Sequence, residues 1–132
     1  MALPNNHPLF EIHLDTTTNS IASTPLACAV VSPIRGKIVK VTAVSHGAFT
    51  TDCSIAVAII TAPAAGVAPG SGTAVGGSPM TLDDTNSAAG TTTSMVPTSA
   101  NFVNEGDIIV FTPSGSTGTT IGGTFAAFIQ PA

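Results

Sequence analysis

Charged residues are scarce in this chain, and their scarcity limits the classes of protein to which it can belong. Asp, Glu, Lys and Arg make up 8% of the 132 residues, whereas about 25% is usual in soluble domains. The basic residues are only Arg35, Lys37 and Lys40. Because nucleic-acid binding needs a dense cluster of cations, we expect no nucleic-acid partner. Hydrophobic residues make up 43% of the chain, so it should fold rather than remain disordered.

Long apolar runs and the larger aromatic residues are missing as well. The longest apolar runs, residues 26–31 and 55–60, are far shorter than the ~18 residues of a membrane span. We therefore expect no membrane partner. Residues 1–10 lack the basic start and apolar stretch of a secretory signal, so we expect no such signal there. The chain has no Trp and no Tyr, which argues against a lectin with aromatic sugar platforms. Its threonines follow no regular Thr-x-Thr ladder of the kind that binds ice.

Cysteine is rare too, with Cys28 and Cys53 each in or beside an apolar run. Free cysteine behaves as a small hydrophobic residue, and nothing in the sequence indicates an oxidising compartment. We therefore predict two buried free thiols, and a single Cys28–Cys53 disulfide is the alternative.

What the chain does contain is a series of short runs of Val, Ile, Thr and Phe, separated by Gly, Pro, Ser and Asn. No segment carries apolar residues at helical spacing, so the pattern predicts an all-β fold. We expect about eight strands in an antiparallel β-sandwich or jelly-roll-like domain. They cover residues 10–15, 26–32, 36–45, 54–62, 79–82, 92–96, 107–113 and 121–130.

The length favours one domain. We assign residues 21–132 to a single β-sandwich domain and residues 1–20 to an extended N-terminal arm or edge strand. Between residues 62 and 90 the composition changes to Gly, Ala, Pro and Ser. This segment predicts a long loop with one short strand at 80–82, and loops of this length are commonly functional or mobile.

The N-terminal segment alternates apolar and polar residues from 10 to 15, so one side of this strand should face solvent. Two upstream prolines restrict the segment to extended conformations, which would suit pairing with the sheet edge of a neighbouring subunit. The alternative is an ordinary strand of its own domain. Under the first hypothesis, the contact is made by Leu9, Phe10, Ile12 and Leu14.

Two of the expected strands, at 55–60 and 125–129, are apolar on both faces. An antiparallel strand with one solvated face normally alternates apolar and polar residues. Either another subunit covers the second face, or the small alanines there tolerate water.

No motif for catalysis or metal binding stands out. The histidines and cysteines lack the close spacing of a zinc site, and there is no G-x-S-x-G elbow. The nearest approach to a nucleophile with a base is Cys53 with His46 and Asp52. Asp83 and Asp84 are adjacent, which indicates a turn rather than the paired acid and base of a glycosidase. We therefore expect no catalytic residue, no metal, no cofactor and no small-molecule substrate.

The C-terminal third, NFVNEGDIIVFTPSG followed by STGTTIGGTFAAFIQPA, contains an acidic turn, a strand, a second turn and a closing strand. Together with RGKIVKVTAV, SIAVAII and GGSPMTL, this segment resembles the capsid decoration (cement or head-fibre) proteins of tailed bacteriophages. The resemblance spans roughly residues 35–130.

The resemblance implies a non-enzymatic virion protein, made in the host cytoplasm, that sits on the capsid exterior. Such a protein is usually a homotrimer that bridges capsomers of the major capsid protein. The low surface charge is compatible with this role, because neighbours in an assembly cover surfaces that would otherwise associate. The alternative is a carbohydrate or cell-surface binding module, such as a fibre tip or adhesin-like domain, that recognises its ligand through residues 62–90.

Overall fold

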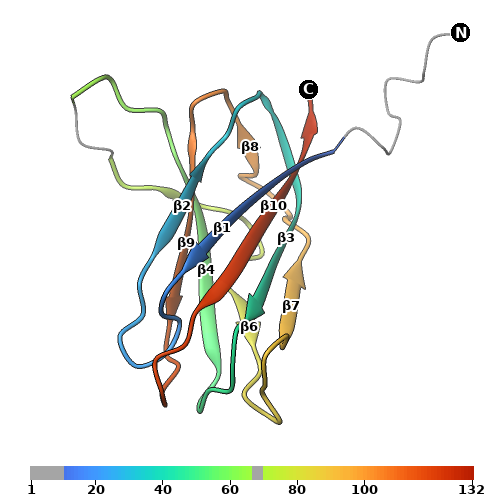
Figure 1. The fold of residues 1–132 in the computed structure, drawn as a ribbon. Helices are drawn as coiled ribbons and strands as arrows, with labels where there is room; N and C mark the ends of the chain where they lie inside the picture. Colours follow the sequence, from blue (N-terminus) through green and yellow to red (C-terminus); the bar gives the residue numbers. More distant parts are fainter. Residues whose placement is uncertain (1–10, 67–69) are drawn as a thin grey trace, which may run out of the picture.

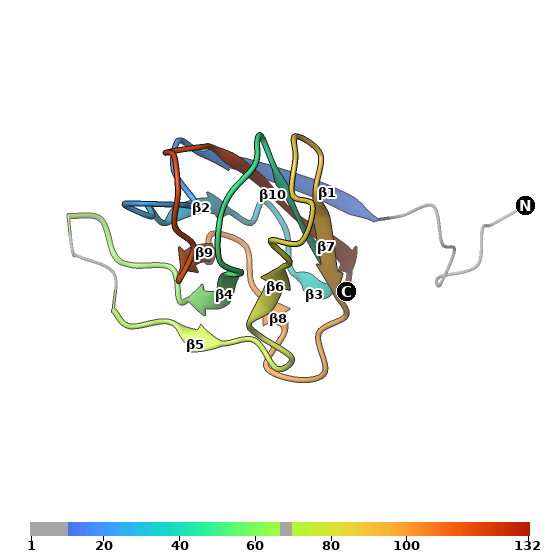
Figure 2. The ribbon, with the colours of Figure 1, turned by 90° about the horizontal axis from the view of Figure 1, so that it is seen from below.

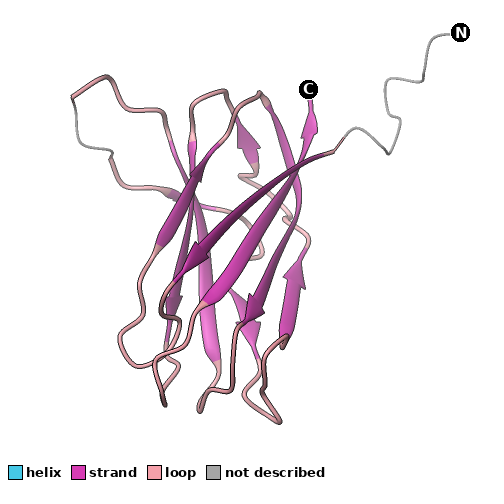
Figure 3. Cartoon of the chain, in the orientation of Figure 1, coloured by secondary structure: helices cyan, strands magenta, loops and turns pink. Residues whose placement is uncertain are grey.

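The computed structural model describes residues 11–66 and 70–132, which form ten strands and no helix (Figure 3). The strands form two antiparallel five-stranded sheets. Sheet A has the order β1–β10–β3–β7, with β8 also paired to β3; these strands are β1 Ile12–Thr18, β10 Gly123–Pro131, β3 Gly36–Ser45, β7 Thr92–Met95 and β8 Phe102–Val103. Sheet B has the order β2–β9–β4–β5, with β6 also paired to β4; these strands are β2 Cys28–Val31, β9 Ile108–Ser114, β4 Cys53–Ile60, β5 Thr73–Ala74 and β6 Met80–Leu82.

The two sheets face one another in a sandwich-like arrangement, and the core lies between them (Figures 1 and 2). Alternation along each strand sends every second side chain inward. In β9, for example, Ile109 and Phe111 are fully buried, as are Phe125 and Ala127 in β10. The rings of Phe111 and Phe125 stack across the two layers with centroids 5.2 Å apart.

The all-β prediction is confirmed, and each expected strand overlaps an observed one. The chain also contains two further strands, β5 and β8, each of two residues. The segment from 62 to 90 is not a projecting loop along its whole length, because the strands β5 and β6 within it both pair with β4. Two-residue strands escape sequence reasoning because they contain no full period of alternation. The part of this segment that projects from the body joins β4 to β5 (Figure 1).

Residues 12–18 form the edge strand β1, which pairs with β10 along its whole length, from Ile12 with Ile129 to Thr18 with Gly123. Its exposure alternates as expected, with His13 and Asp15 exposed. Two hydroxyls reach from β1 to the other sheet's edge: Thr16 donates to the carbonyl of Ala29 at 3.3 Å, and Thr18 donates to the carbonyl of Leu26 at 2.8 Å. These bonds hold the two sheets together along this side.

A β-bulge interrupts the pairing of β10 with β3. Phe128 lies opposite Lys40 and Ile129 lies opposite Ile38, so Val39 has no partner in the register. One extra residue in β3 reverses the alternation at this point. As a result, Ile38 and Val41 are both fully buried although they are three residues apart.

The start of β3 passes so close to β10 that only glycine fits there. A Cβ on Gly36 would lie 2.5 Å from the carbonyl oxygen of Gln130 and 2.7 Å from Cγ2 of Ile129, whereas Gly70 faces open space. We expect Gly36→Ala to lower the free energy of unfolding by about 1–3 kcal/mol, because the β10 backbone must move. Gly70→Ala should change it by less than about 0.5 kcal/mol. Urea denaturation of both variants measures the difference, and equal midpoints would contradict the close approach.

Candidate functional site

The outer face of sheet B is the surface best suited to a partner, because it is apolar and carries no charge. The five strands of this sheet contain no Asp, Glu, Lys, Arg or His. Since Ile109 and Phe111 point inward, Ile108 and Val110 point to the outside. Cross-strand pairing places further outward residues beside them. The apolar part of the outer face of sheet B consists of Ala29, Val31, Ala56, Ala58, Ile60, Ala74, Ile108 and Val110, and the rest of that face carries Ser54, Thr81, Thr112 and Ser114.

This apolar surface is accessible to solvent. The side chain of Val31 is 57% exposed, and Leu26, just before β2, is 51% exposed. Val110 and Ile60 are half-buried at the centre of the sheet. The β4–β5 connection, with Pro63 and three alanines among its described residues, projects from one end of the same sheet (Figure 2). Two-sided apolarity, which the sequence indicated for β4, therefore extends to the neighbouring strands β2, β9 and β5.

The outer face of sheet A has the opposite character. It carries all the charged residues that lie within strands, namely His13, Asp15, Lys37 and Lys40. Threonines that are scattered along the sequence also meet here, because register brings distant strands together. One row across the sheet contains Thr17, Thr124, Val44 and Thr92, and the next contains Asp15, Ala126, Thr42 and Ser94.

The N-terminal residues proposed to contact a neighbour are placed only in part. Leu9 and Phe10 lie outside the described residues. Ile12 and Leu14 are half-buried on the inner side of β1, and Leu14 packs against the domain's own core. The contact with a neighbouring subunit therefore stays a prediction.

The set Cys53, His46 and Asp52 is not assembled into a nucleophilic site. Sγ of Cys53 is buried and lies 3.6 Å from the carbonyl oxygen of Ile21. Nε2 of His46 hydrogen-bonds to Oγ1 of Thr124 at 2.8 Å. The Asp52 carboxylate accepts a hydrogen bond from the backbone of another loop. Each of the three side chains is thus engaged with a different part of the fold.

Asp52, Asp83 and Asp84 form a cluster whose carboxylate oxygens lie within 4.8 Å of one another. As predicted, Asp83 and Asp84 follow a strand, β6, rather than lying within it. The backbone N–H of Asp84 donates to Asp52 at 2.9 Å, and the N–H of Thr51 donates to Asp84 at 3.0 Å. The N–H of Thr85 donates to Asp83 at 2.7 Å and lowers the pKa of that carboxyl. The first two of these bonds join the loop before β4 to the loop after β6.

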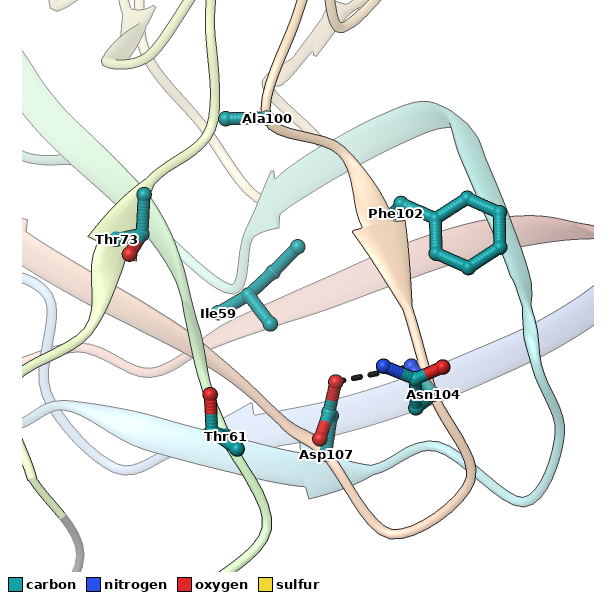
Figure 4. A pocket seen from close by; sticks show the side chains of 7 residues that line it. All are labelled: Ile59, Thr61, Thr73, Ala100, Phe102, Asn104 and Asp107. Atoms are coloured by element: carbon teal, nitrogen blue, oxygen red, sulfur yellow. Dashed lines mark hydrogen bonds between the residues drawn. The ribbon is translucent and has the colours of Figure 1, made fainter.

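A groove of about 270 Å³ opens between β5 and β8, with Ile59 at its base (Figure 4). It contains one carboxylate, that of Asp107, which is 95% buried. One oxygen of Asp107 accepts the N–H of Ala62 at 3.0 Å, and the other accepts the N–H of Asn104 at 2.9 Å. Ser32 N–H also donates to the Asp107 carbonyl at 2.8 Å. Asp107 therefore joins the ends of β2 and β4 to the turn before β9, which is a structural role.

Both cysteines are free thiols, as predicted, although Cys28 is only half-buried while Cys53 is fully buried. Burial raises the pKa of each thiol. Since the thiolate is the reactive form, neither residue is suited to nucleophilic chemistry near neutral pH.

No known protein family matches the sequence, and no curated protein is detectably similar to it.

Across the described residues, the chain has no helix with the length and apolarity needed to cross a membrane.

Replacing Asp107 tests its structural role. We expect Asp107→Ala to reduce the free energy of unfolding by about 2 kcal/mol or more, because two backbone N–H groups lose their acceptor. Glu105→Ala removes an exposed carboxylate from the same turn and should cost less than about 0.5 kcal/mol. Chemical denaturation measures both changes in the free energy of unfolding, provided that the m-value of each variant equals that of the unmodified protein. A similar loss of stability in the two variants would contradict the structural role assigned to the Asp107 carboxylate.

The state of the cysteines can be measured by thiol titration. We expect two reactive thiols per chain in denaturant and much slower reaction of the native protein at pH 7. The native rate should rise with pH and reach half its maximum above the pKa of an ordinary thiol, because burial raises both pKa values. Absence of reactive thiols in denaturant would instead establish the disulfide.

Proposed function

We propose that the protein is a non-enzymatic structural component of a tailed-phage virion. In this role it binds the outside of the capsid as a homotrimer and stabilises the shell by bridging capsomers of the major capsid protein. The observation that supports this proposal most directly is the uncharged, apolar outer face of sheet B. The sequence resemblance to capsid decoration proteins supports it independently. A jelly-roll connection of the strands and an extended N-terminal arm belong to the same proposal.

The physical argument rests on what an apolar sheet face does in water. Exposed apolar surface gains about 25 cal/mol for each Å² that a partner covers, and contiguous apolar patches on a soluble protein commonly mark interaction sites. A cyclic trimer offers each copy a neighbour on either side. Because such a ring joins two different patches of each copy, we assign one of these patches to the outer face of sheet B, whose burial removes no charge from water.

Binding to a shell then follows from multivalency. A trimer that engages three equivalent sites gains effective concentration after the first contact, so each contact can be weak. Expansion of the shell during genome packaging would create such sites where capsomers meet. The bound trimer would oppose internal pressure by adding binding energy across these junctions.

A carbohydrate or cell-surface module that uses residues 62–90 has less support. That segment contains no aromatic residue, and strands β5 and β6 within it are paired to β4. Recognition through this loop would therefore rely on small side chains.

The assignment is tested by placing a lysine on each outer face. Val110 and Val44 are both half-buried valines on central strands, Val110 on the outer face of sheet B and Val44 on that of sheet A. We expect the unmodified protein to have three times its 13.0 kDa chain mass by light scattering. Val110→Lys should shift the mass to the monomer and weaken co-sedimentation with undecorated shells at least tenfold. Val44→Lys should leave both unchanged.

If the protein is a monomer at every concentration but still binds shells, the trimer is contradicted and the virion role is not. A protein that fails to bind undecorated shells of the phage that encodes it would overturn the proposed function as a whole. Circular dichroism of both lysine variants controls for folding, since each substitution is on a solvent-facing position.

A further inference from the structure

The β-bulge in β3 gathers the positive charge of the chain on one surface. Lys37 and Lys40 are three residues apart, so a regular strand would point them to opposite faces of the sheet. Because Val39 is unpaired in the register, Lys37 lies opposite Gln130 and Lys40 opposite Phe128, and both lysines are exposed. Bulges of this kind re-aim side chains near functional sites.

Two cations of this surface, Lys40 and Arg35, lie beside an aromatic ring. Nζ of Lys40 is 5.9 Å from the ring centroid of Phe128. Phe102 is the register partner of Lys37 in β8 and is 45% exposed. The guanidinium carbon of Arg35, just before β3, is 5.3 Å from the centroid of the Phe102 ring. All basic side chains of the chain are therefore on or next to the outer face of sheet A, among ring faces.

These cations have no carboxylate partners. In the part of the chain that the structure describes, the one close contact of a basic side chain with a carboxylate joins Nε2 of His13 to Asp15 at 2.8 Å, and no carboxylate lies within 4.0 Å of Arg35, Lys37 or Lys40. Residues 1–10 and 67–69 contain no Asp or Glu that could supply one. An anion could therefore bind here without displacing an internal partner.

The surroundings of the cations contain several hydrogen-bonding groups. Gln130 is exposed next to Lys37, and Thr42 and Ser94 continue the outer face beyond Lys40. His13 stacks on Phe128 with ring centroids 4.6 Å apart, which extends the aromatic surface to β1. Amides and hydroxyls of this kind match the hydroxyls of sugars.

We propose that the outer face of sheet A binds an acidic glycan, a chain of sugars that carry carboxylates. Arg35, Lys37 and Lys40 bind the carboxylates, and the exposed ring of Phe102 packs on the apolar face of a sugar ring. Three cations are few for a nucleic acid, whose affinity depends on many phosphate contacts, whereas a sheet face with an amide and hydroxyls beside the cations suits a polysaccharide. This site is on the opposite sheet from the assembly surface proposed above, so both can be occupied together.

The test uses oligogalacturonate as the probe, with its methyl ester as the neutral counterpart of the same sugar ring. We expect oligogalacturonate to bind at low salt and to shift the backbone NMR signals of Lys37, Lys40 and Phe102. The methyl ester should bind at least tenfold more weakly. Lys37→Gln combined with Lys40→Gln should weaken binding at least tenfold, and Phe102→Ala should weaken it severalfold.

A charge-matched control separates a local site from general electrostatics. Thr119→Glu combined with Thr120→Glu lowers the net charge by the same two units at an exposed turn between β9 and β10, and it should leave binding within twofold. The glutamine variant should keep the native mass of the unmodified protein, which distinguishes this site from the proposed assembly surface. Three outcomes would overturn the proposal: no binding of oligogalacturonate, equal losses in the two double variants, or equal or tighter binding of single-stranded DNA.

Discussion

The stacked rings of Phe111 and Phe125 are the contact on which the two layers depend. Each ring comes from a central strand of its sheet, and both are fully buried. With no Trp or Tyr in the chain, these two rings are the largest fully buried side chains, and the rest of the core consists mainly of smaller ones. The inward direction of these two residues also determines which residues of β9 and β10 face solvent.

The chain therefore produces two outer faces of opposite chemistry from one core. Sheet B has uncharged strands, and its outer face is made mainly of Ala, Val and Ile, with Ser and Thr beside them. Sheet A receives the charged strand residues and rows of threonine. One face is suited to lasting burial against protein, and the other to reversible contact with a hydrated ligand. The charged residues within strands are confined to sheet A, while the other acidic residues lie mainly in loops.

Sequence patterns predicted the longer strands well, since each contains at least one full period of alternation. They also indicated the second apolar face of β4. They could not locate β5 and β8, which are two residues long, or the pairing that brings Thr17, Thr124 and Thr92 into one row. The bulge at Val39 depends on β10, about ninety residues away, and the role of Asp107 depends on Ala62. Such features arise from long-range register, which no local window contains.

The unequal faces make the folded protein an amphiphile with a fixed orientation. At an air–water boundary, the apolar outer face of sheet B can turn toward the air while Lys37, Lys40 and Asp15 on sheet A stay hydrated. In a thin film of the free protein, the molecules would then adopt a narrow range of orientations. Particles in which partners cover sheet B would lose this bias, so the distribution of views in electron micrographs reports whether that face is occupied.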